Sequence, residues 1–426
     1  MKTAKRSPVV GTVLLLALTT ACAQPTAELG PVTTLMESGA SNPTVAAAPT
    51  GGRAYVAWVA TEGEESNVWL TGLDADGDRG HAVRVNDVDG DAAPHLQAPA
   101  QVAAGPDEQV YVLWTNNTHI EGRRFPASDL RFARSTDGGA TFEPAITVND
   151  DAGGPPTSHT FHNVLVAPDG TIIASWLDSR RGGEGMHPAE TGMAVGEGHV
   201  TSDDMPEVPG PDVRVAISTD GGRSFAPSHI VNRQACPCCR TAMAMAPDGT
   251  LYLAWRKIFE GDVRDIVVAR STDKGISWEE PRRVAEDDWV FPGCPHAGPA
   301  LTVDPSGALH VAWYTGRESA PGLFYTKSVD AGLSFQAPTP LLSDAWVPPS
   351  QVSLGAESDG TLWVAWEERR LDVPSFYYVR RGPGKALSLD GALNQSGSNP
   401  VFATAGGPPV MAWLDGDAVR VRGGGG

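Results

Sequence analysis

The chain has 426 residues, of which 41% are hydrophobic, and its formal net charge is −19 at pH 7. This acidic balance argues against nucleic acid and anionic lipid as partners, because both carry negative charge themselves. The 48 glycines and 35 prolines favour a turn-rich all-β domain with a large core, and the average hydrophobic content excludes a disordered chain.

The chain begins with a segment typical of an export signal. Residues 1–6 are basic and residues 9–18 are apolar, and Cys22 follows shortly after. This segment resembles a bacterial lipoprotein signal, which implies that Cys22 is the lipidated first residue of the mature protein. The alternative is an ordinary signal cleavage that removes Cys22, since the apolar run is too short for a permanent membrane helix. Residues 1–22 are then the signal and residues 23–30 a linker, and we expect the protein at the cell envelope, anchored by lipid to a membrane and facing the periplasm or the exterior.

Short apolar strands that end in Trp recur along the rest of the chain. Seven such strands are present, and they end at Trp58, Trp114, Trp176, Trp255, Trp313, Trp366 and Trp413. Hairpin turns such as Pro247-Asp248-Gly249 precede them. Nearly continuous apolar runs suit strands that are buried between two neighbouring sheets. The repeats predict a closed β-propeller of four-stranded blades, with seven blades.

The last repeat is incomplete, because residues 399–422 supply only three strands before a glycine tail at residues 423–426. We predict that residues 31–36 supply the fourth strand, so that the two ends of the chain share one blade and leave no free sheet edge. The predicted propeller covers residues 31–422. A long loop at about residues 178–212 interrupts it, either as a loop without a role or as a lid over the central channel.

A second repeat has the pattern Ser-x-Asp-x-Gly-x-Ser/Thr-Phe/Trp. Its four copies occupy residues 135–142, 218–225, 271–278 and 328–335. In such a hairpin turn the Ser and Asp oxygens accept hydrogen bonds from the amides of the turn, while Gly supplies a positive φ. We therefore predict a structural role for the four aspartates, which are Asp137, Asp220, Asp273 and Asp330.

This second repeat resembles the Asp box of sialidases and of the bacterial neuraminidase-repeat proteins. The resemblance covers nearly the whole chain after the signal and implies a β-propeller; because sialidases have six blades, six is the alternative to seven. It also raises the hypothesis of a glycoside hydrolase, for which the candidate substrate-binding residues are Arg240, Arg256, Tyr314 and Glu367. The aromatic-Arg-Ile-Pro motif of sialidases is absent, and residues 41–44 read Ser-Asn-Pro-Thr in its place.

Propeller topology predicts which face each loop occupies. In a blade with strands A to D, the A–B and C–D turns lie on one face, and the B–C loops and the connectors to the next blade lie on the other. The Asp-containing repeats are C–D turns. Strand A is innermost, so the residues just before each strand A should lie at the mouth of the central channel.

Cysteines and histidines gather in these connectors. The candidate metal ligands are His95, His159, His162, Cys236, Cys238, Cys239, Cys294 and His296. Three hypotheses apply to the cysteines: disulfides, as is usual in exported proteins; a soft metal ion, copper or zinc, held by thiolates and imidazoles; or thiol redox chemistry beside Arg240. His159 and His162 are three residues apart on an extended segment, so only one of them should face the channel.

We predict that Cys236, Cys238, Cys239, Cys294 and His296 form one cluster, because two adjacent blades bring their connectors together around a narrow axis. Three functions remain open. The first is an exported, lipid-anchored propeller whose cluster binds copper or zinc or performs thiol redox chemistry. The second is a glycoside hydrolase. The third is a non-catalytic propeller with structural disulfides that binds a protein or a glycan. We expect a monomer without a nucleic-acid partner, and whether it is an enzyme stays open.

Overall fold

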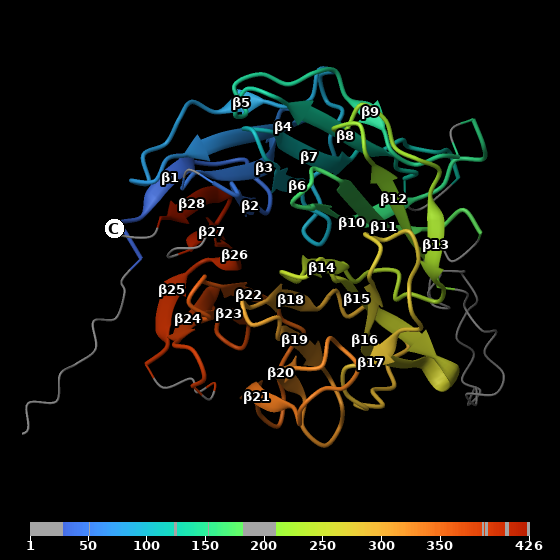
Figure 1. The fold of residues 1–426 in the computed structure, drawn as a ribbon, viewed down its shortest axis with the longest axis vertical. Helices are drawn as coiled ribbons and strands as arrows, with labels where there is room; N and C mark the ends of the chain where they lie inside the picture. Colours follow the sequence, from blue (N-terminus) through green and yellow to red (C-terminus); the bar gives the residue numbers. More distant parts are fainter. Residues whose placement is uncertain are drawn as a thin grey trace, which may run out of the picture.

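The computed structural model describes residues 29–50, 52–122, 126–151, 153–181, 210–385, 387, 391–404 and 409–423. These residues form seven antiparallel sheets of four strands each, arranged in a ring (Figure 1). The predicted all-β propeller is therefore confirmed, with seven blades and not six. Within the described ranges the one helical segment is the short 3-10 turn η3 (Glu260–Asp262).

Each blade runs from an innermost strand A to an outermost strand D. The A strands are β2 (Thr44–Ala47), β6 (Gln101–Ala104), β10 (His159–Val166), β14 (Ala242–Met245), β18 (Ala300–Val303), β22 (Val352–Ala356) and β26 (Ser398–Ala403). The B strands are β3 (Ala54–Glu62), β7 (Val110–Thr115), β11 (Ile172–Asp178), β15 (Leu251–Phe259), β19 (Leu309–Thr315), β23 (Leu362–Glu368) and β27 (Val410–Asp415). The C strands are β4 (Glu65–Leu73), β8 (Leu130–Ser135), β12 (Asp212–Ser218), β16 (Val263–Ser271), β20 (Gly322–Ser328), β24 (Ser375–Arg381) and β28 (Ala418–Arg422). The D strands are β5 (Val83–Arg84), β9 (Ile146–Thr147), β13 (His229–Asn232), β17 (Arg282–Arg283), β21 (Thr339–Ser343), β25 (Leu393–Ser396) and β1 (Thr33–Met36).

The two ends of the chain close the ring. Strand β1 pairs with β28, with Thr33 opposite Val421 and Thr34 opposite Arg420. The amide of Gly30 also donates to the carbonyl of Gly423 at 2.7 Å. The last blade therefore has the strand order β1-β28-β27-β26, as predicted from its incomplete repeat.

The core lies between neighbouring blades, and the B strands form its centre. Every residue of β7, β11, β19 and β23 is buried. The side chains of Trp114, Trp176, Trp255, Trp313 and Trp413 are at most 1% exposed. A B strand has a packed sheet on each side, so both of its faces are apolar, which explains the nearly continuous apolar runs in the sequence.

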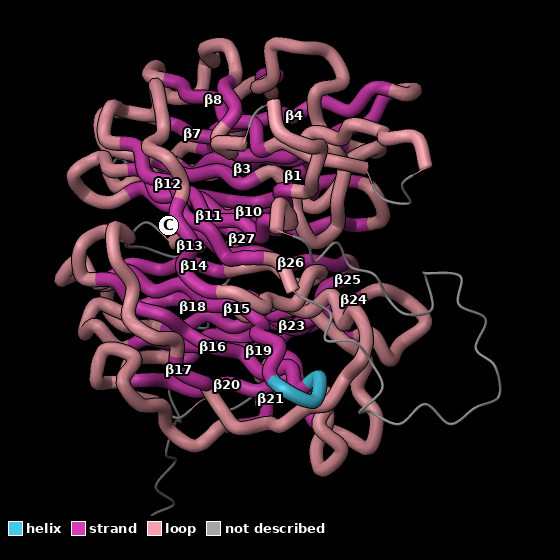
Figure 2. Tube along the Cα trace, turned by 90° about the vertical axis from the view of Figure 1, so that its right-hand side faces the viewer, coloured by secondary structure: helices cyan, strands magenta, loops and turns pink. Residues whose placement is uncertain are grey.

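The repeated Asp turns share one face with the A–B turns. The amide of Gly138, in the first Asp turn, donates to the carbonyl of Glu108, in the A–B turn of the same blade, at 2.9 Å. Lys274, in the third Asp turn, forms an ion pair with Asp169, in an A–B turn. The blade connectors and the B–C loops, including η3, therefore lie on the opposite face (Figure 2).

The Asp turns contain the predicted hydrogen bonds. In the first turn, the amide of Gly139 donates to Ser135 Oγ at 2.9 Å, and the amide of Thr141 donates to Asp137 Oδ1 at 3.0 Å. The hydroxyl of Thr141 donates to Asp137 Oδ2 at 2.6 Å. This last bond, followed by those from Ser135 and from the Thr141 amide, lowers the pKa of Asp137 to about 2. The other three turns repeat the pattern, which agrees with a structural role for the aspartates.

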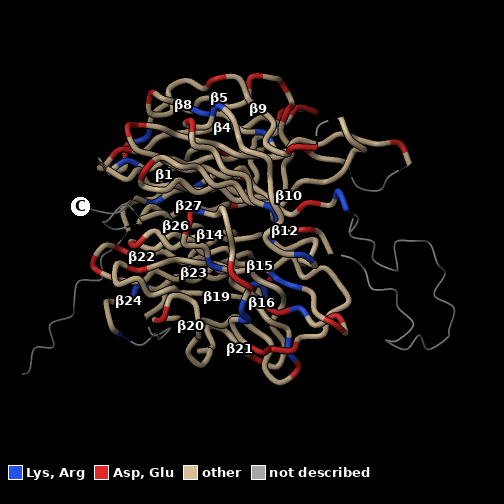
Figure 3. Tube along the Cα trace, turned by 45° about the vertical axis from the view of Figure 1, so that its right-hand side comes forward, with Lys and Arg blue, Asp and Glu red and all other residues tan. Residues whose placement is uncertain are grey.

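Charge and two sequence features complete the description. Asp and Glu exceed Lys and Arg by 51 to 32, and both kinds are spread over the loops and outer strands (Figure 3). No helix of the described ranges is long and apolar enough to cross a membrane. The predicted lipidation site Cys22 and residues 182–209 of the predicted long loop lie outside the described residues.

Candidate metal centre

The first part of the centre is the connector between β13 and β14, which carries Cys236-Pro237-Cys238-Cys239. This segment is held against strand β15, because the amide of Cys236 donates to the carbonyl of Arg256 at 2.8 Å. The amide of Cys239 donates to the carbonyl of Cys236 at 3.4 Å and closes a turn. The turn therefore places the side chains of its three cysteines close together.

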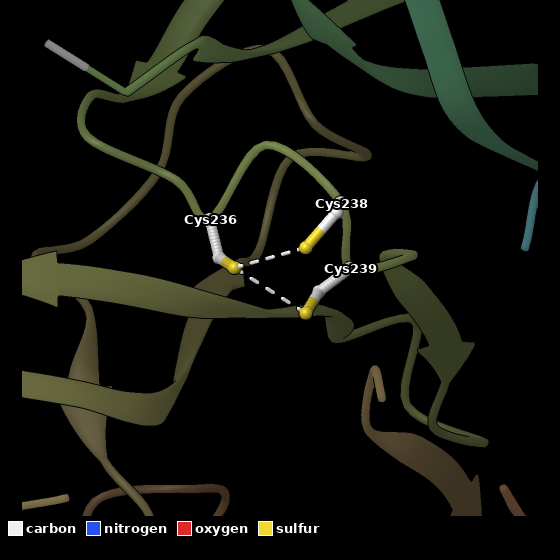
Figure 4. A group of neighbouring side chains, drawn as sticks. All are labelled: Cys236, Cys238 and Cys239. Carbon is white, nitrogen blue, oxygen red and sulfur yellow. Dashed lines mark hydrogen bonds between the residues drawn. The ribbon is translucent and has the colours of Figure 1, made fainter. Parts of the chain in front are cut away.

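The three sulfurs of this turn point toward one another (Figure 4). Cys236 Sγ lies 3.4 Å from Cys239 Sγ and 3.7 Å from Cys238 Sγ. A disulfide would require about 2.05 Å, so these residues are thiols. Two sulfurs that bind one metal ion at about 2.3 Å are about 3.8 Å apart in a tetrahedral site. The separation of the sulfurs thus matches a shared ion, and the exposed fractions of Cys236, Cys238 and Cys239 are only 0%, 5% and 1%.

The second part of the centre is the connector between β17 and β18. Its Cys294 and His296 lie beside Cys238, and the three ligand atoms are all within 4.8 Å of one another. Cys294 is half-buried and His296 is exposed, so the centre extends from the core to the surface. The predicted cluster of four cysteines and His296 thus exists, and Cys238 belongs to both of its groups.

One arginine contacts a sulfur of the cluster, and a second acts on the same sulfur through its charge. Arg264 Nη1 donates to Cys236 Sγ at 3.4 Å and to the carbonyl of Gly293 at 2.7 Å. Arg256, which is 1% exposed, donates to the carbonyls of Arg264, Ala297 and Tyr314 at 2.7, 3.0 and 2.6 Å.

No described carboxylate lies within 4 Å of the Arg256 guanidinium. A buried cation without an anion nearby is destabilising. The charges of Arg264 and Arg256 contribute to the low pKa of Cys236, so they favour negative charge on the adjacent turn.

The pKa values of the three buried thiols diverge. Burial tends to raise the pKa of Cys236, but hydrogen bonds from Cys238 and Cys239, together with the charges of Arg264 and Arg256, hold it well below its usual range. Hydrogen bonding to Cys236 raises the pKa of Cys238. Burial and the same partner raise the pKa of Cys239 to about 12. The low pKa of Cys236 favours its thiolate form, and thiolate is the form that binds metals.

His159 is not part of the cluster. Its Nδ1 is bonded to the carbonyl of Ser128 at 2.6 Å, and its Nε2 to Asp151 Oδ2 at 3.0 Å. Both ring nitrogens are therefore engaged away from the cysteines, and the groups of ligand atoms within 4.8 Å of one another do not include it among the described residues.

His162 also lies outside these groups. Its Nε2 is bonded to the carbonyl of Leu113 at 3.1 Å, and its burial lowers its pKa to about 4. Both His159 and His162 are buried, and the expectation that only one of them faces the channel stays a prediction. The register of β10 shifts between Thr160 and Asn163, and Phe161 has φ 54°, so the strict alternation of an extended strand is interrupted there.

His95 lies near the outer part of the cluster but is not in either group. Its ring contacts Phe161 edge-on, with centroids 5.4 Å apart, and its Nδ1 accepts the amides of Gln97 and Ala98 at 3.1 and 3.0 Å. Burial, and then the charge of His296, lower the pKa of His95. Nδ1 is thus engaged by the main chain, which leaves Nε2 as the remaining ring nitrogen.

The candidate substrate-binding residues hold the connectors in place. Arg240 donates to the side chain of Gln351, whose Nε2 donates to the carbonyl of His296 at 2.6 Å. Glu367 accepts the amides of Gln351 and Asn399 at 3.1 and 2.8 Å.

Tyr314 and Arg256 are engaged in the same way. The hydroxyl of Tyr314 donates to the carbonyl of Val347 at 2.8 Å, and Arg256 is buried against three carbonyls. The polar groups of Arg240, Arg256, Tyr314 and Glu367 thus bond to other parts of the protein. A role of these four residues in substrate binding stays a prediction.

Sequence reasoning missed the position of Arg264 beside Cys236, because only the pairing of β15 with β16 brings Arg264 to this point, opposite Ile258.

Comparison with known proteins identifies the fold. No family model and no curated protein matches the chain. Among solved structures, an ulvan lyase of polysaccharide lyase family PL25 has a TM-score of 0.56 at 12% identity, over 92% of this chain and 95% of that chain. The leech intramolecular trans-sialidase has a TM-score of 0.46 at 11% identity, over 91% and 90%. The Hadza microbial sialidase Hz136 has a TM-score of 0.47 at 14% identity, over 85% and 74%. At such identities the likeness shows the propeller fold alone.

Proposed function

We propose that this protein is an exported, lipid-anchored β-propeller that binds a soft metal ion, copper(I), at its cysteine cluster. The observation that carries the proposal is the group of three buried sulfurs. Cys236 Sγ lies 3.4 and 3.7 Å from the other two, and Arg264 donates to it at 3.4 Å. Thiolates select copper(I) and zinc among the biological metals, so the donor set narrows the ion to these two.

The number of donors favours copper(I) over zinc. A structural zinc site is closed by four protein ligands. Cys236, Cys238 and Cys239 form a group of three, and no described cysteine, histidine or carboxylate joins them as a fourth donor within 4.8 Å of all three. Copper(I) accepts a trigonal set of thiolates, so this group suits it without rearrangement.

The charge around the group also suits a thiolate-bound monovalent ion. Three thiolates and one copper(I) have a net charge of −2. Arg264, which contacts Cys236 and also pairs with Asp262 at 3.2 Å, and Arg256, which is buried, supply positive charge beside this group. A buried charge is tolerated when it is compensated nearby, and the arginines provide part of this compensation.

Location is the second part of the proposal, and it is supported by residues 9–22, which resemble a lipoprotein signal. An envelope protein meets copper that has entered from outside the cell. A lipid at Cys22 and the cluster at the channel mouth together make a membrane-held copper-binding protein. The propeller then serves as a rigid support that aims the ligands.

The test is the metal content of the full chain, purified under reducing and anaerobic conditions. We expect copper in the purified protein, or uptake of added copper(I), and free thiols in the metal-depleted protein. Cys236→Ser should remove the metal from the group of Cys236, Cys238 and Cys239, whereas Cys22→Ser should not. Zinc instead of copper would correct the identity of the ion, while metal-free protein with paired cysteines would overturn the proposal in favour of a disulfide function.

A further inference from the structure

We propose that the cluster holds two copper(I) ions and that the Cys238 thiolate bridges them. Cys236, Cys238 and Cys239 hold the inner ion, and Cys238, Cys294 and His296 hold the outer ion. This inference rests on the proposed function, because it assumes that the cysteines bind copper. It adds the number of ions, the ligands of each and which of them exchanges.

The distances within the cluster exclude a single ion for all four sulfurs. Two sulfurs that bind the same ion at about 2.3 Å are at most about 4.6 Å apart. The ligand atoms within 4.8 Å of one another form two groups, and Cys294 is not in the group with Cys236 and Cys239. Cys294 therefore lies beyond 4.8 Å from at least one of these two sulfurs. One ion at the inner group leaves Cys294 and His296 without metal, although they are placed as ligands.

Cys238 is the residue that both groups share. Its sulfur is 3.7 Å from that of Cys236, and it lies within 4.8 Å of Cys294 Sγ and of a ring nitrogen of His296. A thiolate sulfur has several lone pairs and can bind two soft ions at once. The position of Cys238 between the two groups is the position that a bridging ligand requires.

The second ion adds no net charge to the site. When copper(I) binds at the outer group, the sulfur of Cys294 forms a bond to copper and its proton passes to solvent. Two copper(I) ions and four thiolates with a neutral His296 then have a net charge of −2, the same as one ion with three thiolates and a protonated Cys294. Arg256 and Arg264, the latter also paired with Asp262, therefore lie beside the same net charge in both states.

The two ions differ in access to solvent. The inner ligands are at most 5% exposed, whereas Cys294 is half-buried and His296 is exposed. The outer group has three protein ligands on the protein side and solvent on the other. We therefore infer that the outer ion exchanges with thiols or chelators in solution, while the inner ion is retained.

The outer ligands are held rigidly. Pro295 stands between Cys294 and His296, and His296 has φ 50°. Its carbonyl accepts Gln351 Nε2 at 2.6 Å, which ties this connector to the next blade. A non-glycine residue with positive φ is retained where the surroundings determine it, as is common at binding sites.

The experiment is an anaerobic titration of the reduced full chain with copper(I), in competition with a chromophoric chelator. We expect two equivalents per chain in the unchanged protein, one of them released to the chelator at least tenfold faster. His296→Ala should bind one equivalent and lose the fast-exchanging ion. X-ray absorption at the copper edge should show a short copper–copper distance in the unchanged protein and none in His296→Ala.

A variant of a second exposed histidine serves as the control for this titration. His81→Ala removes another exposed histidine and should keep two equivalents. Because His296 is exposed, its substitution should not prevent folding, which circular dichroism checks. One equivalent in both the unchanged protein and His296→Ala would overturn the second ion but leave the proposed function intact. Two equivalents in His296→Ala would also overturn the inference, whereas no copper in any form would overturn the proposed function itself.

Discussion

The guanidinium of Arg264 lies 3.4 Å from the sulfur of Cys236, and it also bonds to the carbonyl of Gly293 at 2.7 Å and to the carboxylate of Asp262 at 3.2 Å. Arg264 thereby joins strand β16 to both connectors of the cluster. A positive charge at this distance favours the thiolate form of Cys236, and the thiolate is the form that binds a metal ion.

We predict that Arg264→Gln lowers the fraction of Cys236 that is in the thiolate form. In metal-free protein the pKa of Cys236 is low, because hydrogen bonds from Cys238 and Cys239 and the charge of Arg264 overcome the effect of burial. The ultraviolet absorbance of the thiolate at neutral pH should therefore fall by about the signal of one cysteine. Arg270→Gln, on the same strand, is the matched control, since Arg270 pairs with Glu279 at 2.7 Å away from the cluster. An unchanged absorbance in Arg264→Gln would show that the arginine does not set the charge state.

Two glycines with positive φ allow the cost of backbone conformation to be measured separately from the cost of steric overlap between blades. Gly222 has φ 81°, and a Cβ there would lie 2.7 Å from Phe132 of the preceding blade. Gly249 also has a positive φ, 88°, but a Cβ there meets nothing within 4 Å. Gly249→Ala should lower the free energy of unfolding by about 1 kcal/mol through φ alone, and Gly222→Ala by about 2–3 kcal/mol because of the added overlap. Chemical denaturation measures both, and equal losses would mean that the blades can shift apart freely.

The Asp turns predict acid sensitivity. Hydrogen bonds within the turn, first from Thr141, hold the pKa of Asp137 at about 2, below its ordinary value of 3.8. The folded protein therefore binds the proton less readily than the unfolded chain. The stabilisation is complete above pH 4 and is lost as the pH falls toward about 2, and the same holds for Asp220 and Asp330.

Asp273 offers a test of this acid sensitivity. Burial opposes the shift, but the hydroxyl and amide of Ser277 and the hydroxyl of Ser271 lower its pKa to about 2. Asp273→Ala should cost about 1 kcal/mol at pH 7 through loss of these bonds, and less at pH 2. Copper binding should be unchanged, since the turn lies on the face opposite the cluster. Guanidinium unfolding at pH 7, 4 and 2 measures the loss of stability in Asp273→Ala. An equal loss at all three pH values would contradict the lowered pKa of Asp273.

Ring closure predicts that strand β1 is essential for stability. Deletion of residues 23–36 removes the partner of β28 and exposes an unpaired edge. We expect a clear fall in the unfolding temperature and a tendency to aggregate, measured by calorimetry and light scattering. Deletion of residues 23–28 alone is the control and should have little effect. An unaltered unfolding temperature after the longer deletion would refute closure through β1.

The lipid anchor is testable in a bacterial host. Cys22→Ser should abolish incorporation of labelled fatty acid and move the protein from the membrane fraction to the soluble fraction of the envelope. Cys294→Ser is a suitable control, because it changes a cysteine of the cluster and should leave the protein at the membrane. A protein that stays membrane-bound and unlabelled in both forms would exclude lipidation at Cys22.

The fold was predictable because each of its signals is local. A strand that ends in Trp114 and a turn that contains Asp137 need only their own neighbours to form, since hairpin pairing and turn hydrogen bonds act over a few residues. Repetition then specifies the number of blades, and the three-stranded final repeat specifies the partner of β28. The same reasoning predicted the meeting of Cys238 with Cys294, because adjacent blades bring their connectors to one axis.

Tertiary structure alone decided which ligands share an ion and what surrounds them. The sequence cannot show that Cys294 lies too far from Cys236 or Cys239 to join them, since this depends on how two blades pack across the channel. It also cannot show that His159 and His162 are both buried, because a register shift between Thr160 and Asn163 interrupts the alternation of an extended strand. Distances of a few tenths of an ångström between residues far apart in sequence follow from the packing of the whole ring, whereas turns and strands follow from the sequence itself.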